Sequence, residues 1–180
     1  MRHTFTAEQW LPYPVATVFT FFANPDNLPR LMPSWQKSRI ERATFAPPPE
    51  RPGSAVPPRT GVIAAGAGTT MTISFRPIPL SPVRISWDAR ITEFEWNDHF
   101  CDQQDAGPFA YWRHCHRIEP RLNIATGTEG SLLHDVVEYE LPMGAIGEIA
   151  NKLFVGRQLK STFAYRQKRT QELLELATRP

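Results

Sequence analysis

The chain has 180 residues, enough for one domain with a sizeable core, and its 41% hydrophobic and 11% aromatic content excludes a largely disordered protein. Its formal net charge of only +2, from 20 basic and 18 acidic residues, gives no indication of a nucleic-acid partner. No stretch approaches the roughly 20 apolar residues that span a bilayer, and the start, MRHTFTAEQW, shows no signal-peptide pattern. We therefore expect a cytoplasmic protein without integral membrane association.

The N-terminal segment predicts a strand, two short helices and a second strand. Apolar and polar residues alternate in Thr4–Trp10, as in a half-buried strand. Pro14 precedes VATVFTFFAN, and proline is favoured at a helix start because its missing N–H is not needed there. Pro25 ends that helix, and a second short helix reaches about Met32. Strand character resumes over Ser38–Phe45.

A proline-dense stretch at about residues 46–60 contains APPPERPGSAVPPR. Prolines cannot donate hydrogen bonds to a strand ladder, so this stretch must leave the sheet. Neither flank alone has enough strands to bury a core. We therefore expect a long surface loop inside a single domain spanning 1–180, and the sequence leaves open whether the loop is a lid over a cavity or a plain insertion.

Strands dominate the middle of the chain and a helix ends it. Two-residue alternation runs through residues 71–75 and 85–94 and returns in Thr126–Leu141. A long amphipathic helix is expected from about Ile146 to Ala177. We assign Arg166, with the other charged residues of this helix, to its solvated side, and we interpret YRQKR as a helix face rather than a nucleic-acid patch.

The segment Phe100–Ile118 predicts an antiparallel hairpin folded at a Gly-Pro turn. The face of its second strand that lacks arginines should point inward, and it carries Trp112, His114, His116 and Ile118. The register then sets Asp102 opposite His114 and Gln104 opposite Trp112. Cys101 and Cys115 become neighbours on the outward face. A disulfide is conceivable there, but two free thiols are expected in a reducing cytosol.

Several inward residues are candidates for a site. In the last strand, the outward Glu138 and Glu140 send Asp135 and Tyr139 inward. Together with Trp87, Phe100 and Trp112, the tyrosine would form an aromatic wall suited to a ring-containing ligand, although such a stripe is also typical of plain core. Buried charge is costly without partners, which draws attention to the polar inward set: Asp102, Gln104, His114, His116 and Asp135.

Three interpretations of the polar set are open. It is a structural network in which aspartates satisfy histidines, or it orients a ligand's hydroxyl or carbonyl group, or it is catalytic. In the catalytic case, Asp102 or Asp135 orients His114, which takes a proton alpha to a carbonyl while His116 or Gln104 steadies the enolate. No serine or cysteine stands beside His114 on either inward strand, so covalent hydrolysis has no support.

Grouped antiparallel strands with segregated helices indicate an α+β domain. The chain resembles the SRPBCC or START-like superfamily, which includes the birch-pollen-allergen (Bet v 1-like) fold and polyketide cyclases/dehydrases, and in particular its bacterial ligand-binding branch. The resemblance is carried by FTFFANPDNLPRLMPSW, FCDQQDAGPFAYWRHCHRIEP and DVVEYELPMGAIG. It implies a helix-grip fold, a curved sheet around a long C-terminal helix, with a deep apolar cavity for a hydrophobic small molecule.

The expected function is therefore binding of a hydrophobic, ring-containing small molecule, lipid or polyketide-like, by a monomer or homodimer. Cyclase, dehydratase or isomerase chemistry stays undecided, and we assign no cofactor and no metal. One alternative is a non-haem iron site formed by the two histidines with Asp102 or Asp135. Another is a protein-interaction module without a small-molecule ligand.

Overall fold

The computed structural model describes residues 1–51, 64–144 and 154–178. Within these ranges the strands form one antiparallel sheet of seven, in the order β1-β7-β6-β5-β4-β3-β2. Their bounds are β1 Arg2–Leu11, β2 Arg39–Thr44, β3 Thr70–Phe75, β4 Ile85–Glu95, β5 His99–Ala106, β6 Tyr111–Asn123 and β7 Thr128–Glu140.

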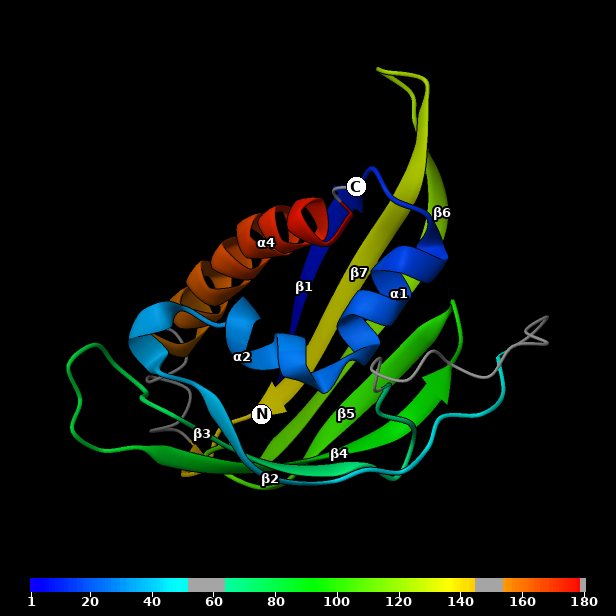
Figure 1. Ribbon diagram of the computed structural model, residues 1–180. Helices are drawn as coiled ribbons and strands as arrows, with labels where there is room; N and C mark the ends of the chain where they lie inside the picture. The colour runs from blue at the N-terminus through cyan, green and yellow to red at the C-terminus, as the bar shows by residue number, and fades with distance from the viewer. Residues whose placement is uncertain (52–63, 145–153, 179–180) are drawn as a thin grey trace.

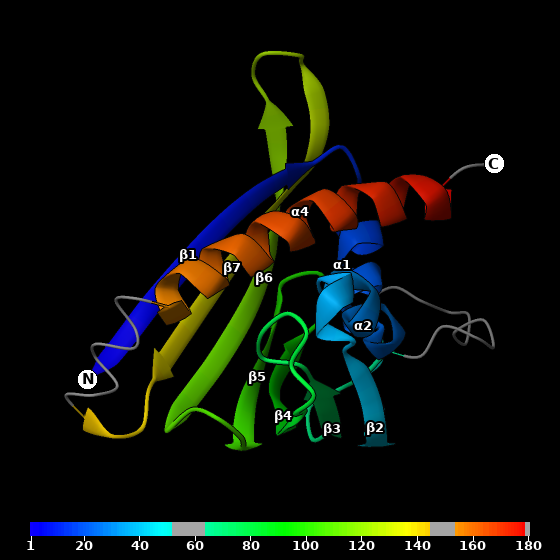
Figure 2. The ribbon, with the colours of Figure 1, turned by 90° about the vertical axis from the view of Figure 1, so that its left-hand side faces the viewer.

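All described helices lie on one face of this curved sheet (Figure 1). They are α1 Val15–Ala23, the 3-10 turn η1 Pro25–Asn27, α2 Leu28–Leu31, the 3-10 turn η2 Ser34–Gln36 and the long α4 Gly156–Thr178. Figure 2 shows α4 running along the sheet with α1 and α2 beside its C-terminal part. The fold is the helix-grip architecture that the sequence indicated, with two short helices after the first strand.

The core has two parts that flank the middle of α4. One lies at the end of the sheet covered by α1, where Phe19, Ile118 and Leu173 are almost fully buried. The other packs Phe163 of α4 against Val137 and neighbouring residues of β7. Each fully buried side chain of this size contributes about 1.5–3 kcal/mol to folding. These clusters fix α4 at both ends over the sheet.

The central hairpin has the predicted register. Asp102 pairs with His114 across β5 and β6, and His116 pairs with Asp135 across β6 and β7. Both histidines and Asp135 are buried on the helix-covered face, whereas Arg117 is exposed on the other. The inward direction deduced from strand alternation is therefore confirmed for His114, His116 and Asp135, and Asp102 faces the same side.

The prediction of two free thiols is wrong, because Cys101 and Cys115 form a disulfide. The residues are directly opposite each other in β5 and β6, with Cα atoms 4.1 Å apart. The expectation came from a presumed cytosolic location and not from geometry, which allows the bond. Cys101 is also buried rather than solvent-facing, at 1% exposure, beneath the outward side chains of Glu93 and Arg113.

Two predicted segments lie partly outside the described residues: 52–60 of the proline-dense stretch and 146–153 of the expected C-terminal helix. The described start of the stretch contacts α1, where Arg51 donates to Thr20 Oγ1 at 2.7 Å, and the turn after β4, where Trp96 Nε1 donates to the Pro49 carbonyl at 2.6 Å. In the described ranges, no helix combines the length and apolar character that a membrane crossing requires.

Candidate functional site

A cavity of about 250 Å³ lies between the sheet and the helices. Strands β3, β4, β5 and β6 supply one wall, and α2, η2 and α4 supply the opposite one. Alternate strand residues point to the helix-covered face, and most of the residues at these positions are apolar, so the wall is mainly apolar. Met71, Ile73 and Phe75 on β3 and Ala89 and Ile91 on β4 all contribute to it.

Two tryptophans form one end of the cavity. Trp87 on β4 and Trp112 on β6 meet edge to face, with ring centroids 4.8 Å apart. Phe109, from the hairpin turn, packs against both rings and also lines the cavity. Such perpendicular aromatic pairs hold their geometry and offer a flat apolar surface to a ligand.

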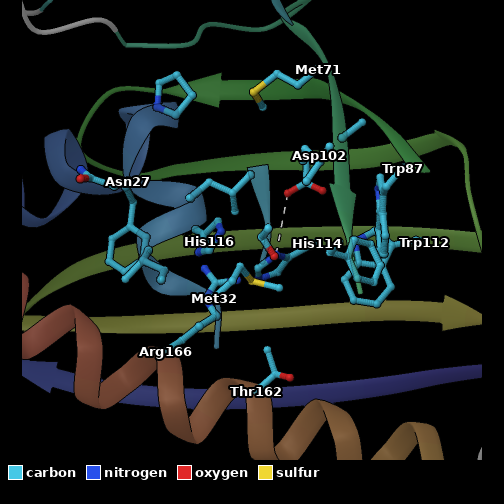
Figure 3. Close-up of a pocket in the computed structure, with 18 of the residues that line it drawn as sticks. Asn27, Met32, Met71, Trp87, Asp102, Trp112, His114, His116, Thr162 and Arg166 are labelled. Atoms are coloured by element: carbon cyan, nitrogen blue, oxygen red, sulfur yellow. Dashed lines mark ion pairs between the residues drawn. The ribbon is translucent and has the colours of Figure 1, made fainter. Parts of the chain in front are cut away.

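Polar side chains meet at the middle of the cavity wall (Figure 3). Asp102, His114 and His116 line the hollow, and Asp135 lies behind them on β7. His114 Nε2 lies 2.9 Å from Asp135 Oδ1 and forms a hydrogen bond with it. His116 Nδ1 lies 2.7 Å from the same oxygen, but at an angle that does not suit a hydrogen bond. One carboxylate therefore contacts two neighbouring imidazoles, whose ring centroids are 4.1 Å apart with the ring planes inclined at 52°.

Burial sets the protonation of this cluster. It lowers the pKa of His114 and of His116, since a charged imidazole is poorly solvated there. Burial alone would raise the pKa of Asp135, but the close contacts with both imidazoles, including the hydrogen bond to His114, outweigh it and hold that pKa well below its usual range. At neutral pH the arrangement is two neutral imidazoles on one ionised, shielded carboxylate.

Asp102 has a different role in the cavity. Its Oδ1 lies 3.8 Å from His114 Nδ1, and 24% of its side chain is exposed, facing the hollow. Because the surroundings are apolar, burial raises the pKa of this carboxyl, although His114, Arg166 and the Trp112 side chain partly offset the shift. Asp102 is therefore the carboxyl that a bound molecule can reach.

Three predicted site residues do not line the cavity. Asp135 is covered by the histidines. Gln104 turns to the hairpin loop, where its side chain donates to the Phe109 carbonyl at 2.7 Å and accepts from the Phe109 N–H. Tyr139 is buried in the second core cluster, against His3 and Trp112. Strand alternation correctly predicted the inward face for Asp135 and Tyr139. It could not predict whether these side chains reach the cavity.

The solvated position expected for Arg166 is wrong, and this residue was missed as a site candidate. It is buried at 9% exposure and lines the cavity from α4, together with Thr162 one turn earlier. In Figure 3 both side chains rise from the helix toward the strands that carry Asp102 and His116. The signal in the sequence was spacing, because Arg166 falls in line with Phe163 and Thr170 on the buried stripe of the helix.

The sequence pattern of the family described as "Polyketide cyclase / dehydrase and lipid transport" matches residues 11–167. The chain belongs to this family. The match includes α1, all of the strands that line the cavity and α4 as far as Gln167, and so it contains Arg166. Among curated proteins, no sequence matches the chain.

Several solved structures share the architecture of this member of the polyketide cyclase/dehydrase and lipid-transport family. TTHA0849 from Thermus thermophilus is 15% identical, with a TM-score of 0.65 over 98% of this chain and 100% of that one. Norcoclaurine synthase from Thalictrum flavum, solved with dopamine and hydroxybenzaldehyde, is 14% identical, with a TM-score of 0.60 over 100% and 90%. Ara h 8.0201 is 15% identical, with a TM-score of 0.57 over 97% and 98%. At these identities the likeness shows a shared Bet v 1-like fold.

Proposed function

We propose that the protein binds a hydrophobic, ring-containing small molecule in the cavity between the sheet and α4. The observation that carries this proposal is an apolar hollow of about 250 Å³ with two histidines and a carboxyl on its wall. Ligand pockets typically combine an apolar lining with a few convergent polar groups. The family's link to polyketides and lipids supports the same ligand class.

The polar cluster supports orientation of a ligand oxygen and proton transfer to or from it. His114 keeps Nε2 on Asp135 and presents Nδ1 toward Asp102. A neutral imidazole held by an ionised carboxylate is a competent general base, and the raised pKa of Asp102 makes its carboxyl a potential proton donor. This pairing suits the acid-base steps of cyclisation, dehydration or isomerisation. We propose His114 and Asp102 as the groups that would carry them.

A cavity-filling substitution tests ligand binding directly. Ala89 on β4 is buried and lines the hollow, so Ala89→Phe should occupy ligand space while Ala164→Phe, on the exposed side of α4, should not. Native mass spectrometry should show a small-molecule adduct on the wild type and on Ala164→Phe but not on Ala89→Phe. Binding of the neutral fluorescent probe phenylnaphthylamine should follow the same order. A wild type that carries no adduct and binds no probe contradicts the proposal.

A metal-dependent enzyme is the second candidate, and one observation favours it. Asp102, His114 and His116 each offer one ligand atom, and these atoms lie within 4.8 Å of one another. Contacts from both rings to Asp135 match the outer carboxylate that often orients histidine ligands. The positive charge of Arg166 disfavours a bound metal cation, because it acts electrostatically on Asp102 and His116, two of the three candidate ligands. Elemental analysis of purified protein tests it, and stoichiometric iron or zinc lost in His116→Ala would support it.

A cytoplasmic location, a monomeric or homodimeric state and the absence of a nucleic-acid partner remain predictions. Size-exclusion chromatography with light scattering tests the oligomeric state, and a second, larger assembly would contradict it.

A further inference from the structure

Arg166 is a buried cation that faces the cavity. It stands on α4 with only 9% of its surface exposed, and its guanidinium lies over the Phe163 ring at 5.0 Å from the ring centre. A guanidinium carries five N–H donors and stays charged at any physiological pH. Burying such a group costs several kcal/mol unless an anion and hydrogen-bond acceptors compensate.

Within the described part of the chain, the Arg166 guanidinium has no salt bridge and no hydrogen bond with another residue. The neighbouring α4 cation Arg169 differs, since it pairs with Glu172 at 2.8 Å. The Arg166 guanidinium is therefore available to bind a ligand, unlike a cation that already forms a salt bridge within the fold. The open side of its environment is the cavity.

The groups that face Arg166 across the hollow do not supply a good counterion. From β5 comes Asp102, whose carboxyl makes no salt bridge with the guanidinium and has a raised pKa. From β6 come His114 and His116, both with lowered pKa. Asp135 on β7 is ionised, but both imidazoles stand between it and the cavity. A permanent positive charge thus faces an apolar space.

We infer that the ligand is an acid whose carboxylate pairs with Arg166 while its apolar body lies toward Trp87 and Trp112. This inference rests on the proposed function and narrows its ligand class. The planar fork of arginine matches a carboxylate with two parallel hydrogen bonds. Thr162, buried on the same helix face, adds a hydroxyl near the same point of the cavity. Fatty acids and aromatic acids share this chemistry.

Matched acids and alcohols separate charge recognition from apolar burial. Naphthoic acid is compared with naphthylmethanol, and decanoic acid with decanol, by displacement of phenylnaphthylamine at neutral pH. The wild type should bind the acid of at least one pair about tenfold or more tightly than its alcohol, because a hydrogen bond to a charged group in a dry site is strong. The ring pair and the chain pair show which apolar body the cavity accepts.

Arg166→Met should abolish this preference, weakening the acid about tenfold or more and leaving the alcohol unchanged or tighter. Arg166→Lys, which keeps the charge but not the fork, should retain part of the preference. Lys168→Met removes an exposed charge from the same helix and should behave as the wild type. Thermal unfolding of the ligand-free variants is the second measurement: a binding role predicts an unchanged or higher melting temperature for Arg166→Met.

The outcomes distinguish the inference from the proposed function. Three outcomes overturn the inference but leave the proposed function standing. The wild type binds acid and alcohol equally, or the preference for the acid persists in Arg166→Met, or the acids fail to displace the bound probe. A markedly lower melting temperature of ligand-free Arg166→Met assigns the arginine to the fold and also overturns it. A wild type that neither carries a small-molecule adduct nor binds phenylnaphthylamine overturns the proposed function itself.

Discussion

The Asp135 carboxylate on β7 lies 2.9 Å from Nε2 of His114 on β6, and both residues are buried at 4% exposure. The same oxygen contacts His116, so Asp135 holds the wall of the cavity in place. Asp135→Ala should lower the free energy of unfolding by about 2–4 kcal/mol, because it removes the hydrogen-bond partner of the buried His114 and the carboxylate contact of the buried His116. Urea denaturation measures this. Glu138→Ala, on the outward face of the same strand, should cost no more than about 0.5 kcal/mol.

The two histidines predict acid sensitivity. Their folded pKa lies below the unfolded value of about 6.5, so the unfolded state takes up protons first as the pH falls. Stability is thus fully present above about pH 6.5 and is lost below it, at up to about 1.4 kcal/mol per pH unit for each imidazole. The raised pKa of Asp102 acts in the opposite sense, since it favours the folded state at low pH. Urea titrations at several pH values should show a shallower loss in His114→Gln, and an unchanged slope would contradict the assignment.

The site residues should differ from other polar residues of the same strands in their effect on ligand retention. His114→Ala and Asp102→Asn remove groups that line the cavity, whereas His99→Ala and His134→Ala remove groups on the outward face, where they pair with Asp98 and Glu8. The first two variants should bind phenylnaphthylamine or the extracted ligand more weakly. Equal effects of all four would count against the site.

The disulfide should stabilise the central hairpin. It closes a loop with a sequence separation of 14, for which the loss of unfolded-state entropy corresponds to about 3 kcal/mol. Cys101→Ser with Cys115→Ser should therefore unfold at lower urea concentration than the wild type under non-reducing conditions. Adding a reductant should bring the wild type to the same midpoint. Thiols that react with an alkylating agent in untreated, urea-unfolded protein would show that the bond is absent.

Much of the fold follows from local patterns in the sequence. Alternation placed His114, His116 and Asp135 on the covered face, because a strand side chain has only two directions available. The hairpin register followed from its turn, and it set Asp102 opposite His114. The helix-grip assignment came from the resemblance, and both the family match and the solved structures confirm it.

The boundaries of the cavity did not follow from such patterns. Tyr139 points inward as predicted, yet it packs in the hydrophobic core and does not line the cavity. Strand alternation gives the face of a side chain, whereas the position of a cavity depends on the curvature of the whole sheet. The side-chain amide of Gln104 forms hydrogen bonds with the carbonyl and the N–H of Phe109 in the hairpin turn, so it does not face the cavity. Arg166 was predicted to be solvent-exposed because of its charge alone, although its spacing from Phe163 and Thr170 places it on the buried face of α4.

A crystal structure of the protein with its extracted ligand, or with the tightest-binding acid, is the most direct measurement of the central claim. Our account predicts ligand density inside the cavity, with ring or chain atoms against Trp87 and Trp112 and an oxygen near the cluster of Asp102 and His114. Density only on the outer surface, or a cavity closed by repacked side chains while the ligand is bound elsewhere, would contradict it.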